Sequence, residues 1–216
     1  MFYQDSRQVY RVRELDALPW LLHGFGTRQS DIPAWLTYLA TLKQIHSAKV
    51  VAAEGRCGVL GEGDALLEDR PGAAIAVKTA DCIPILLVDE RHRAVAAVHA
   101  GWRGTATHIA AAAVDAMRVR FGTAAGDLHA AIGPGIGECC FEVGPEVAAQ
   151  FGREGRAHIS LAGANGEQLL AAGVTAARIY ASNLCTMCRA DEFHSFRRDR
   201  EDAGRMYSFV GVRAAE

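Results

Sequence analysis

A thiol and two imidazoles stand in this sequence where apolar runs begin or end: His46, Cys82 and His99. The runs are 48–53, 73–77, 83–88 and 94–98. We interpret them as buried strands, and because strand ends are rigid while the loops beyond them are exposed, such positions suit a reactive site. Two imidazoles and one thiolate are a ligand set that holds zinc with one coordination position open. The pattern therefore favours an enzyme with one metal ion on these three side chains.

Each of the three residues also has a simpler explanation. A free cysteine often fills a core, and a histidine at a strand end is commonly a hydrogen-bonded rim residue. Their intervals along the chain match no compact zinc-finger pattern. Cys82 could also be a nucleophile with His46 or His99 as its base, which would give a cysteine-type hydrolase. A metal-stabilised interaction module is the alternative without catalysis.

Longer motifs narrow this choice, because several of them occur in order and resemble the YfiH-like family. This family is also called multicopper polyphenol oxidoreductase, or laccase-domain, and its members are described as purine nucleoside phosphorylases. Such a series is far more specific than a lone glycine motif. The resemblance covers about 44–210, and its motifs are Thr79–Pro84, Ala97–Thr105, Ala131–Pro134, Cys139–Gly144, Cys185-Thr186, Phe193–Arg198 and Gly204–Met206.

The resemblance implies a metal on His46, Cys82 and His99. It implies zinc, with copper as the alternative because copper binds such donors at least as strongly. The activities that it implies are phosphorolysis of adenosine, inosine and methylthioadenosine, and deamination of adenosine. Copper-dependent oxidation of polyphenols ranks lower, because one three-ligand site lacks the several copper ions that four-electron reduction of oxygen needs.

The segment 29–43 is shorter than the corresponding stretch usual in the family. If that stretch normally forms part of the pocket wall, the pocket of this chain is more open. We then expect relaxed selectivity among adenosine, inosine and methylthioadenosine.

Two further residues are catalytic candidates. Asp81 adjoins Cys82 and could carry the proton when an activated water attacks the adenine ring, although it could instead anchor the turn. Arg103 lies where a glycine-rich turn leads into a predicted helix at Thr105–Phe121. The start of that helix would offer free N–H groups to phosphate, and Arg103 would add a bidentate contact, unless it ties the loop to a carboxylate. Trp102 could stack on a purine or fill the core.

The cysteines Cys139, Cys140, Cys185 and Cys188 form a rival constellation. They could make a four-thiolate zinc site, but adjacent side chains in an extended segment point in opposite directions, so this interpretation is the weaker one. As a redox pair, Cys185 and Cys188 lack the usual βαβ setting. Their role stays open.

Composition excludes several classes of function. The chain has 216 residues, a net charge of −2 and 50% hydrophobic residues, which predicts neither strong nucleic-acid binding nor attraction to anionic membranes. The nearest approach to a basic cluster, Arg197, Arg198 and Arg200, is diluted by acidic neighbours and is interpreted as a solvated face. No leader or membrane span is expected, and six cysteines without a leader indicate reduced thiols in a cytoplasmic protein. The oligomeric state is not predicted.

Alternating apolar runs and helical patterns predict an α/β fold, a single layered domain over residues 1–216 with a mixed β-sheet flanked by helices. Two-sided apolar strands indicate a sheet covered on both faces. The predicted strands are 9–15, 20–25, 50–53, 73–79, 83–88, 94–99, 128–132, 178–181 and 205–212. The predicted helices are 105–121, 145–151 and 166–172, with an ambiguous one at 33–42.

Overall fold

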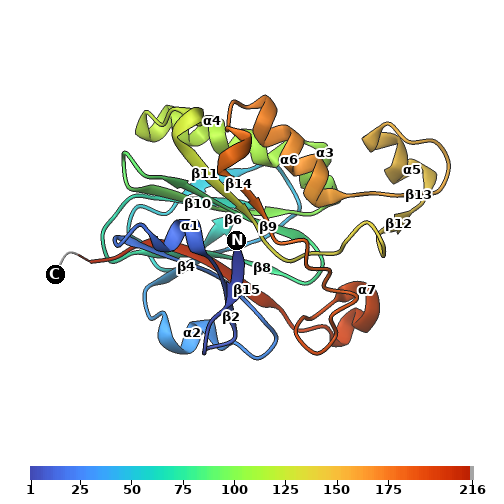
Figure 1. The fold of residues 1–216 in the computed structure, drawn as a ribbon, viewed down its shortest axis with the longest axis horizontal. Helices are drawn as coiled ribbons and strands as arrows, with labels where there is room; N and C mark the ends of the chain where they lie inside the picture. Colours follow the sequence, from blue (N-terminus) through green and yellow to red (C-terminus); the bar gives the residue numbers. More distant parts are fainter. Residues whose placement is uncertain (215–216) are drawn as a thin grey trace.

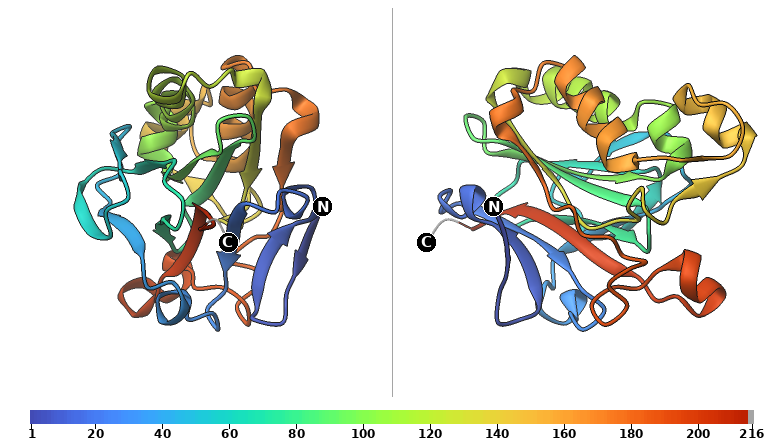
Figure 2. Two further views of the ribbon diagram at one scale, coloured as in Figure 1. Left: turned by 90° about the vertical axis from the view of Figure 1, so that its left-hand side faces the viewer. Right: turned by 45° about the vertical axis from the view of Figure 1, so that its right-hand side comes forward.

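The computed structural model describes residues 1–214 and has three layers (Figure 1). Two sheets pack face to face, and helices cover the outer face of one of them, as the right-hand view of Figure 2 shows. The prediction of a mixed α/β fold flanked by helices is confirmed. The structure contains two large mixed sheets, whereas the sequence pattern predicts one.

Each sheet combines parallel and antiparallel pairs. The seven-stranded sheet has the order β1 (Phe2–Gln4), β2 (Val9–Val12), β3 (Leu21–Gly26), β15 (Met206–Val212), β8 (Ala74–Thr79), β4 (Leu39–Lys43), β6 (Gly58–Glu62). The six-stranded sheet has the order β14 (Ile179–Ala181), β11 (Leu128–Ile132), β9 (Ile83–Asp89), β10 (Ala94–Ala100), β7 (Ala65–Glu68), β5 (Val50–Ala52). A small ribbon pairs β12 (Glu142–Val143) with β13 (Ala157–His158).

The helices are mostly short. The α-helices are α1 (Arg13–Asp16), α2 (Ile32–Trp35), α3 (Trp102–Ala106), α4 (Ile109–Phe121), α5 (Pro145–Ala148), α6 (Leu161–Ala171) and α7 (Phe196–Asp199). Single 3₁₀ turns are Ala125–Asp127, Ala149–Phe151, Ala176–Arg178 and Arg200–Asp202. Among the described residues, none of these helices has the length and apolar character needed to cross a membrane.

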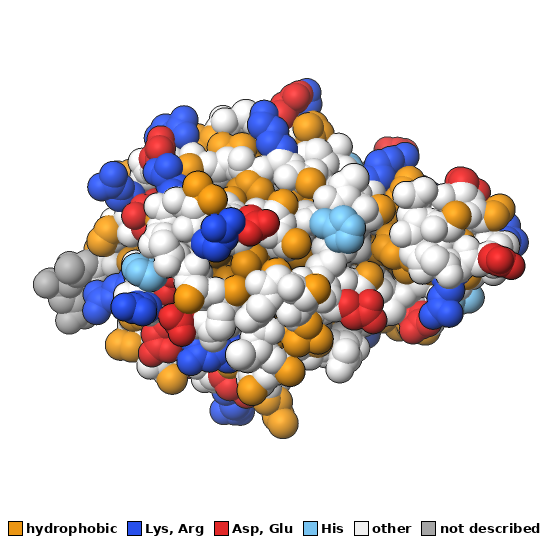
Figure 3. Space-filling model, turned by 90° about the horizontal axis from the view of Figure 1, so that it is seen from above, with side chains coloured by type: hydrophobic (Ala, Val, Ile, Leu, Met, Phe, Trp, Pro, Cys, Tyr) orange, Lys and Arg blue, Asp and Glu red, His pale blue; other side chains and the backbone are white. Residues whose placement is uncertain are grey.

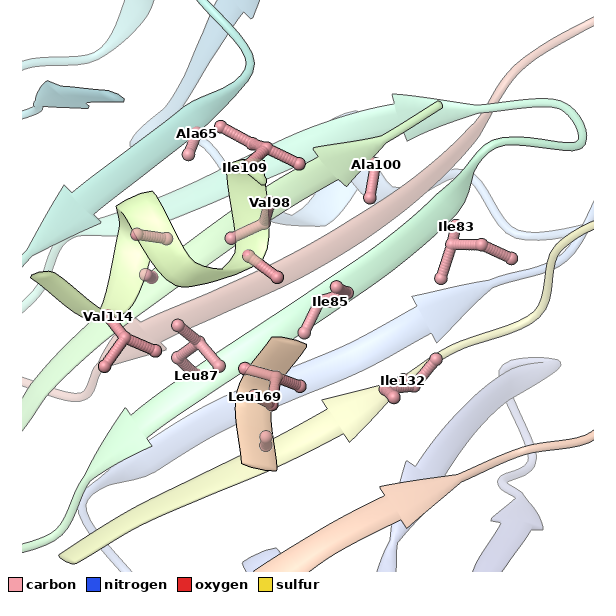
Figure 4. Packing of buried hydrophobic residues seen from close by; sticks show 14 of the residues in the cluster. Ala65, Ile83, Ile85, Leu87, Val98, Ala100, Ile109, Val114, Ile132 and Leu169 are labelled. Atoms are coloured by element: carbon pink, nitrogen blue, oxygen red, sulfur yellow. The ribbon is translucent and has the colours of Figure 1, made fainter. Parts of the chain in front are cut away.

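The two central strands β9 and β10 are buried along their whole length. Because side chains alternate along a strand, Ile85 and Leu87 face the helices and join one core with Leu169 of α6 (Figure 4). Leu86 and Val88, between and beyond them, belong to a second core between the two sheets. The predicted two-sided covering is thus confirmed, with helices on one face and the second sheet on the other.

The helix predicted at 105–121 is in fact two helices. The chain breaks between α3 and α4 at His108, whose φ of 61° lies in the left-handed region. Thr107 donates its hydroxyl back to the carbonyl of Arg103 at 2.9 Å. Gly122 ends α4 with φ 74°, a left-handed conformation that glycine adopts readily.

Other boundaries differ by a few residues. The helix predicted at 166–172 begins earlier, because Ser160 caps it by accepting a hydrogen bond from the backbone of Gly163 at 3.1 Å. The ambiguous segment 33–42 is divided between α2 and β4, and the predicted strand 9–15 gives way to α1 after Val12.

One edge of the molecule collects the connections between the two sheets. Strands β4, β6 and β8 are mutually parallel, and each is followed by a strand of the other sheet, namely β5, β7 and β9. Strands β10, β11 and β14 also end at this edge, because β10 and β11 run antiparallel to β9 and β14 runs parallel to β11. The loops that leave these strands therefore lie together.

Charged side chains of both signs are mixed over the helix-covered face (Figure 3). That face carries no broad area of one sign.

Candidate metal centre

The structure brings His46, Cys82 and His99 together. One nitrogen or sulfur atom from each lies within 4.8 Å of the others. The rings of His46 and His99 meet edge to face, with centroids 4.9 Å apart and an interplanar angle of 74°. His46 comes from the β4–β5 connection, Cys82 from the β8–β9 connection and His99 from the end of β10. His99 is buried, Cys82 is half-buried and His46 is exposed, so the set opens to solvent on one side.

A buried carboxylate, Asp64, holds two members of this set. It lies in the β6–β7 connection with an exposed fraction of 0%. Its Oδ1 accepts hydrogen bonds from Nδ1 of His99 at 2.8 Å and from the backbone N–H of His46 at 2.9 Å. The N–H and hydroxyl of Ser47 donate to Oδ2 at 2.6 and 2.7 Å. Because Nδ1 of His99 donates its hydrogen bond to Asp64, Nε2 is the nitrogen that would bind a metal.

The loop that carries His46 is fixed to the neighbouring strand. The side-chain amide of Gln44 donates to the carbonyl of Lys78 at 2.7 Å and accepts from the N–H of Lys78 at 2.8 Å, as a paired strand residue would. His46 itself has φ 59°, a conformation that its bond to Asp64 helps to hold. Gly101 leaves room for the donors, since a β-carbon there would lie 2.9 Å from Sγ of Cys82 and 3.0 Å from Cδ2 of His46.

The ionisation of Cys82 and Asp64 suits metal binding. Burial favours the neutral thiol of Cys82, but hydrogen bonds from His46 and His99 outweigh it and lower the pKa of Cys82 to about 6. Burial likewise opposes charge on Asp64, but the bonds from His99 and Ser47 bring the pKa of Asp64 to about 2. Burial lowers the pKa of His99, but its hydrogen bonds to Asp64 and Cys82 outweigh burial and raise that pKa to about 9, so a metal ion would have to displace a proton from His99. A thiolate and an imidazole oriented by a carboxylate are a donor set that zinc accepts, so these residues fit a metal ion.

A cavity of about 800 Å³ opens over the three donors. Its wall includes the first two residues of α7, several residues of the segment from Ile136 to Val147, and the aromatic side chains of Trp102, Phe141 and Phe196. The cationic side chains that line it outnumber the acidic ones. The cations are Lys43, Lys78, Arg103, Arg197, Arg200 and Arg205, and the acids are Asp81 and Glu142.

The interpretation of Arg197, Arg198 and Arg200 as a solvated face is therefore wrong in part. Arg197 and Arg200 line the cavity, and Arg205 joins them from the start of β15. Arg198 instead ties its own loop together, donating to the carbonyls of Thr186, Met187 and Phe193 at 2.8–3.2 Å.

Asp81 lies on the cavity wall with both of its oxygens engaged. Oδ1 accepts from the hydroxyl of Thr186 at 2.7 Å, and Oδ2 accepts from the backbone N–H of Arg197 at 2.6 Å. Its φ of 89° shows a tight turn before Cys82. These contacts match the anchoring role considered for it; the proton-carrying role stays a prediction.

Arg103 also reaches the cavity, but not from the start of a long helix. It belongs to the five-residue α3, so the helix expected to present N–H groups to phosphate is much shorter than predicted. The guanidinium of Arg103 lies 4.4 Å from the ring centroid of Trp102. None of the ion pairs formed within residues 1–214 involves Arg103, so the contact with a carboxylate that would tie the loop is not formed there.

The cysteines of the rival constellation also converge. One ligand atom each from Cys139, Cys140, Cys185 and Cys188 lies within 4.8 Å of the others. The objection that adjacent cysteines point apart fails here, because 138–140 form a turn and Cys140 donates its N–H to the carbonyl of Gly137 at 3.0 Å. All six cysteines of the chain, each among the described residues, have free thiols.

Sequence reasoning missed Asp64 and Arg205. The available signal for Asp64 was a carboxylate that follows Gly61-Glu62-Gly63 and directly precedes the apolar run 65–67. A charge at such a position needs a partner when the strand is buried. Arg205 was noticed only as part of a family-like motif.

Comparison with known proteins agrees with the fold and identifies the family. Residues 28–213 match the family described as multi-copper polyphenol oxidoreductase laccase. The chain is 42% identical over 183 residues to a purine nucleoside phosphorylase of Deinococcus radiodurans, covering 80% of this chain and 70% of the relative. It is 40% identical over 224 residues to adenosine deaminase RL5 of an unknown prokaryote, covering 93% and 82%.

The fold is that of YlmD from Geobacillus stearothermophilus, whose crystal structure superposes with a TM-score of 0.91 at 29% identity and 98% coverage of both chains. A layered α/β protein with a histidine–cysteine set that could hold a metal ion is thus the class that fold and site define. The chain belongs to the multi-copper polyphenol oxidoreductase laccase family, and its fold is similar to those of YlmD and YfiH.

Proposed function

We propose that this chain is a zinc-dependent purine nucleoside enzyme that catalyses both phosphorolysis of adenosine, inosine and methylthioadenosine and deamination of adenosine. The observation that carries the proposal is the set of His46, Cys82 and His99 at the base of a cation-lined cavity. Relatives named purine nucleoside phosphorylase and adenosine deaminase support it.

The metal would be held by the two imidazoles and the thiolate. Zinc on three protein ligands keeps a fourth position for water or substrate and lowers the pKa of that water to about 7. Copper is the alternative occupant, because it binds the same donors at least as strongly. Asp64 orients His99 whichever ion is bound, since its bond to Nδ1 leaves Nε2 free.

The cavity supplies the binding contacts for nucleoside and phosphate. Its cationic side chains offer hydrogen bonds to a phosphate, and Arg103 is our first candidate for a bidentate contact. Trp102 is half-buried on the same wall and presents an aromatic surface to a purine. Asp81 is proposed to hold the proton during deamination. To do so, its carboxylate must break one of the two hydrogen bonds that it accepts in the structure.

The short segment 29–43 contributes little to the cavity. Of the side chains that the structure describes in this segment, Leu42 and Lys43 alone are among the lining residues. We therefore keep the expectation that this chain discriminates weakly among adenosine, inosine and methylthioadenosine.

A nucleoside panel with and without phosphate tests the proposal, with products separated by chromatography. Release of free base only when phosphate is present would support phosphorolysis, and inosine formed from adenosine would support deamination. Phenolic substrates belong in the same panel, because the family description names polyphenol oxidation. Turnover of none of these substrates by the zinc-loaded or copper-loaded protein would refute an enzyme of this kind.

Arg103→Ala tests the phosphate contact. We expect the KM for phosphate to rise about tenfold or more, because a charge-assisted hydrogen bond is worth about 1.5–3 kcal/mol. Arg118→Ala, a change of an exposed arginine on α4, is the matched control and leaves that KM unchanged. Weaker deamination with an unaltered dependence on phosphate would show that Arg103 does not bind the anion.

A cysteine-type hydrolase is the second candidate. It is favoured by the series Asp64, His99 and Cys82, because a carboxylate orients an imidazole next to a thiol of lowered pKa. A strong chelator distinguishes the two functions. The metal-dependent enzyme loses activity with the chelator, whereas a hydrolase with Cys82 as nucleophile keeps its activity and loses it with iodoacetamide.

A further inference from the structure

We propose that Cys139, Cys140, Cys185 and Cys188 bind a second zinc ion, which has a structural role and joins two loops behind the cavity wall. This site is separate from the His46, Cys82 and His99 set and shares no residue with it. The proposal does not depend on the reaction that the enzyme catalyses.

The spacing of the sulfur atoms matches a tetrahedral zinc site. Zn–S bonds of about 2.3 Å place the sulfurs of a tetrahedron about 3.8 Å apart. The Sγ atoms of Cys139 and Cys140 are 3.7 Å apart, those of Cys139 and Cys188 are 3.8 Å apart, and those of Cys140 and Cys188 are 3.4 Å apart. A disulfide requires about 2.0 Å, and iron–sulfur clusters distribute their cysteines over several irons, so four mutually close sulfurs suit one ion.

The residues around the four sulfur atoms hold them in positions that suit metal binding. The N–H of Gly137 donates to Sγ of Cys185 at 3.2 Å, and outer hydrogen bonds of this kind orient metal ligands. A β-carbon at Gly137 would lie 3.1 Å from Sγ of Cys139 and 3.3 Å from Sγ of Cys185, so glycine lets the two loops close around the thiols.

The two loops are also joined by the backbone. Gly135 forms an isolated bridge with Cys185, and the N–H of Thr186 donates to the carbonyl of Gly135 at 3.0 Å. The cysteines extend this junction to the cavity wall, because Arg197 of α7 donates to the carbonyls of Cys140 and Glu142 at 3.4 and 3.1 Å. Zinc bound to the four cysteines would fix the position of the loop that carries Cys140 relative to α7.

Structural zinc sites of this type use four thiolates and leave no position open. The set of donor atoms therefore differs from that of the catalytic candidate, which has one thiolate and an open coordination position. This contrast makes the two sites distinguishable in a single protein.

The test is metal content in protein purified under reducing conditions. We expect about two zinc ions per chain in the wild type and about one in Cys185→Ser/Cys188→Ser. Cys57→Ser, a change of an exposed cysteine outside both sets, is the matched control and keeps both ions. His99→Ala should lose the other ion and keep this one.

Cobalt substitution keeps the test decisive if the double variant fails to fold. In the His99→Ala protein, cobalt should give the strong thiolate-to-metal absorption of a four-thiolate site, and thiol titration should release the metal. Equal zinc content in the wild type and a folded double variant, iron in place of zinc, or a cobalt spectrum without that absorption would each overturn the proposal.

Discussion

Replacing Asp64 by asparagine is expected to weaken both the fold around the metal centre and the affinity for the metal. The carboxylate accepts hydrogen bonds from Nδ1 of His99, from the backbone of His46 and from Ser47. Asparagine keeps the shape but has one acceptor oxygen, and its amide N–H groups would face groups that are themselves donors. At least one buried donor therefore loses its partner.

The magnitude follows from the pKa of Asp64, which falls from 3.8 to about 2 in the folded protein. At 1.36 kcal/mol per unit, the folded state favours the ionised carboxyl by about 2 kcal/mol. Because the folded pKa is the lower one, this stabilisation is present above pH 3.8 and is lost as the pH falls toward 2. For the metal, loss of a carboxylate behind a ligating histidine typically costs about 10–100-fold in affinity.

Two measurements check the expectation for Asp64→Asn. Urea unfolding of the chelator-treated protein at neutral pH should give a free energy of unfolding about 2 kcal/mol lower than the wild type. Competition with a chromophoric chelator should show a zinc Kd raised about 10–100-fold. The stability difference from the wild type should shrink as the pH is lowered from 4 toward 2, where the wild-type carboxyl becomes protonated.

Asp89→Asn is the matched control. Asp89 is also fully buried and accepts from Nδ1 of a histidine, His92, at 2.7 Å, but its histidine is not part of the metal centre. This variant should lose stability and keep the zinc affinity of the wild type. Equal losses of zinc affinity in the two variants, or an unchanged affinity in Asp64→Asn, would refute the positioning role of Asp64.

Two other predictions concern space and protonation. Gly101→Ala should reduce zinc affinity about tenfold or more, because its β-carbon would lie 2.9 Å from Sγ of Cys82. Gly126→Ala, which has open space around it, is the control and should leave the zinc affinity unchanged. Equal zinc affinities in the two variants would contradict this prediction. Burial, with the nearby charge of an arginine, lowers the pKa of His23 to about 4, and its Nε2 accepts the N–H of Val12. Unfolding free energy should therefore fall by about 3 kcal/mol as the pH drops from 6.5 to 4, where the unfolded chain binds the extra proton. His23→Gln should flatten that slope in urea titrations, and an unchanged slope would contradict the assignment.

The strands and the three donors could be predicted because each signal is local. Short apolar runs such as 83–88 and 94–98, each containing valine or isoleucine, favour buried strands, and a histidine or cysteine at their ends is visible by type. The break at His108 could not be predicted, since alanines on both sides favour one continuous helix. In the structure α3 packs against β10 and α6, and α4 packs against β10, β5 and β7; these tertiary contacts are not visible in the local sequence.

Charge assignments failed for a different reason. Arg197 and Arg200 stand among acidic residues in the sequence, which indicates a solvated surface. In the structure the backbone N–H of Arg197 is bound by Asp81, more than a hundred positions earlier, and this contact turns α7 toward the cavity. A hydrogen bond between residues so far apart in the chain produces no periodic pattern in the sequence.

The position of the metal centre follows from the way in which the two sheets are connected. His46, Asp64 and Cys82 lie in the three successive connections that lead from β4, β6 and β8 to the other sheet. Because these strands are parallel, their connections meet at one edge, and the register that pairs Val98 with Ala65 brings His99 beside Asp64. A donor moved by two residues along its strand would shift by about 7 Å and leave the set. The centre is therefore as well defined as the pairing of the strands, and a metal bound there would stabilise the contact between the two sheets.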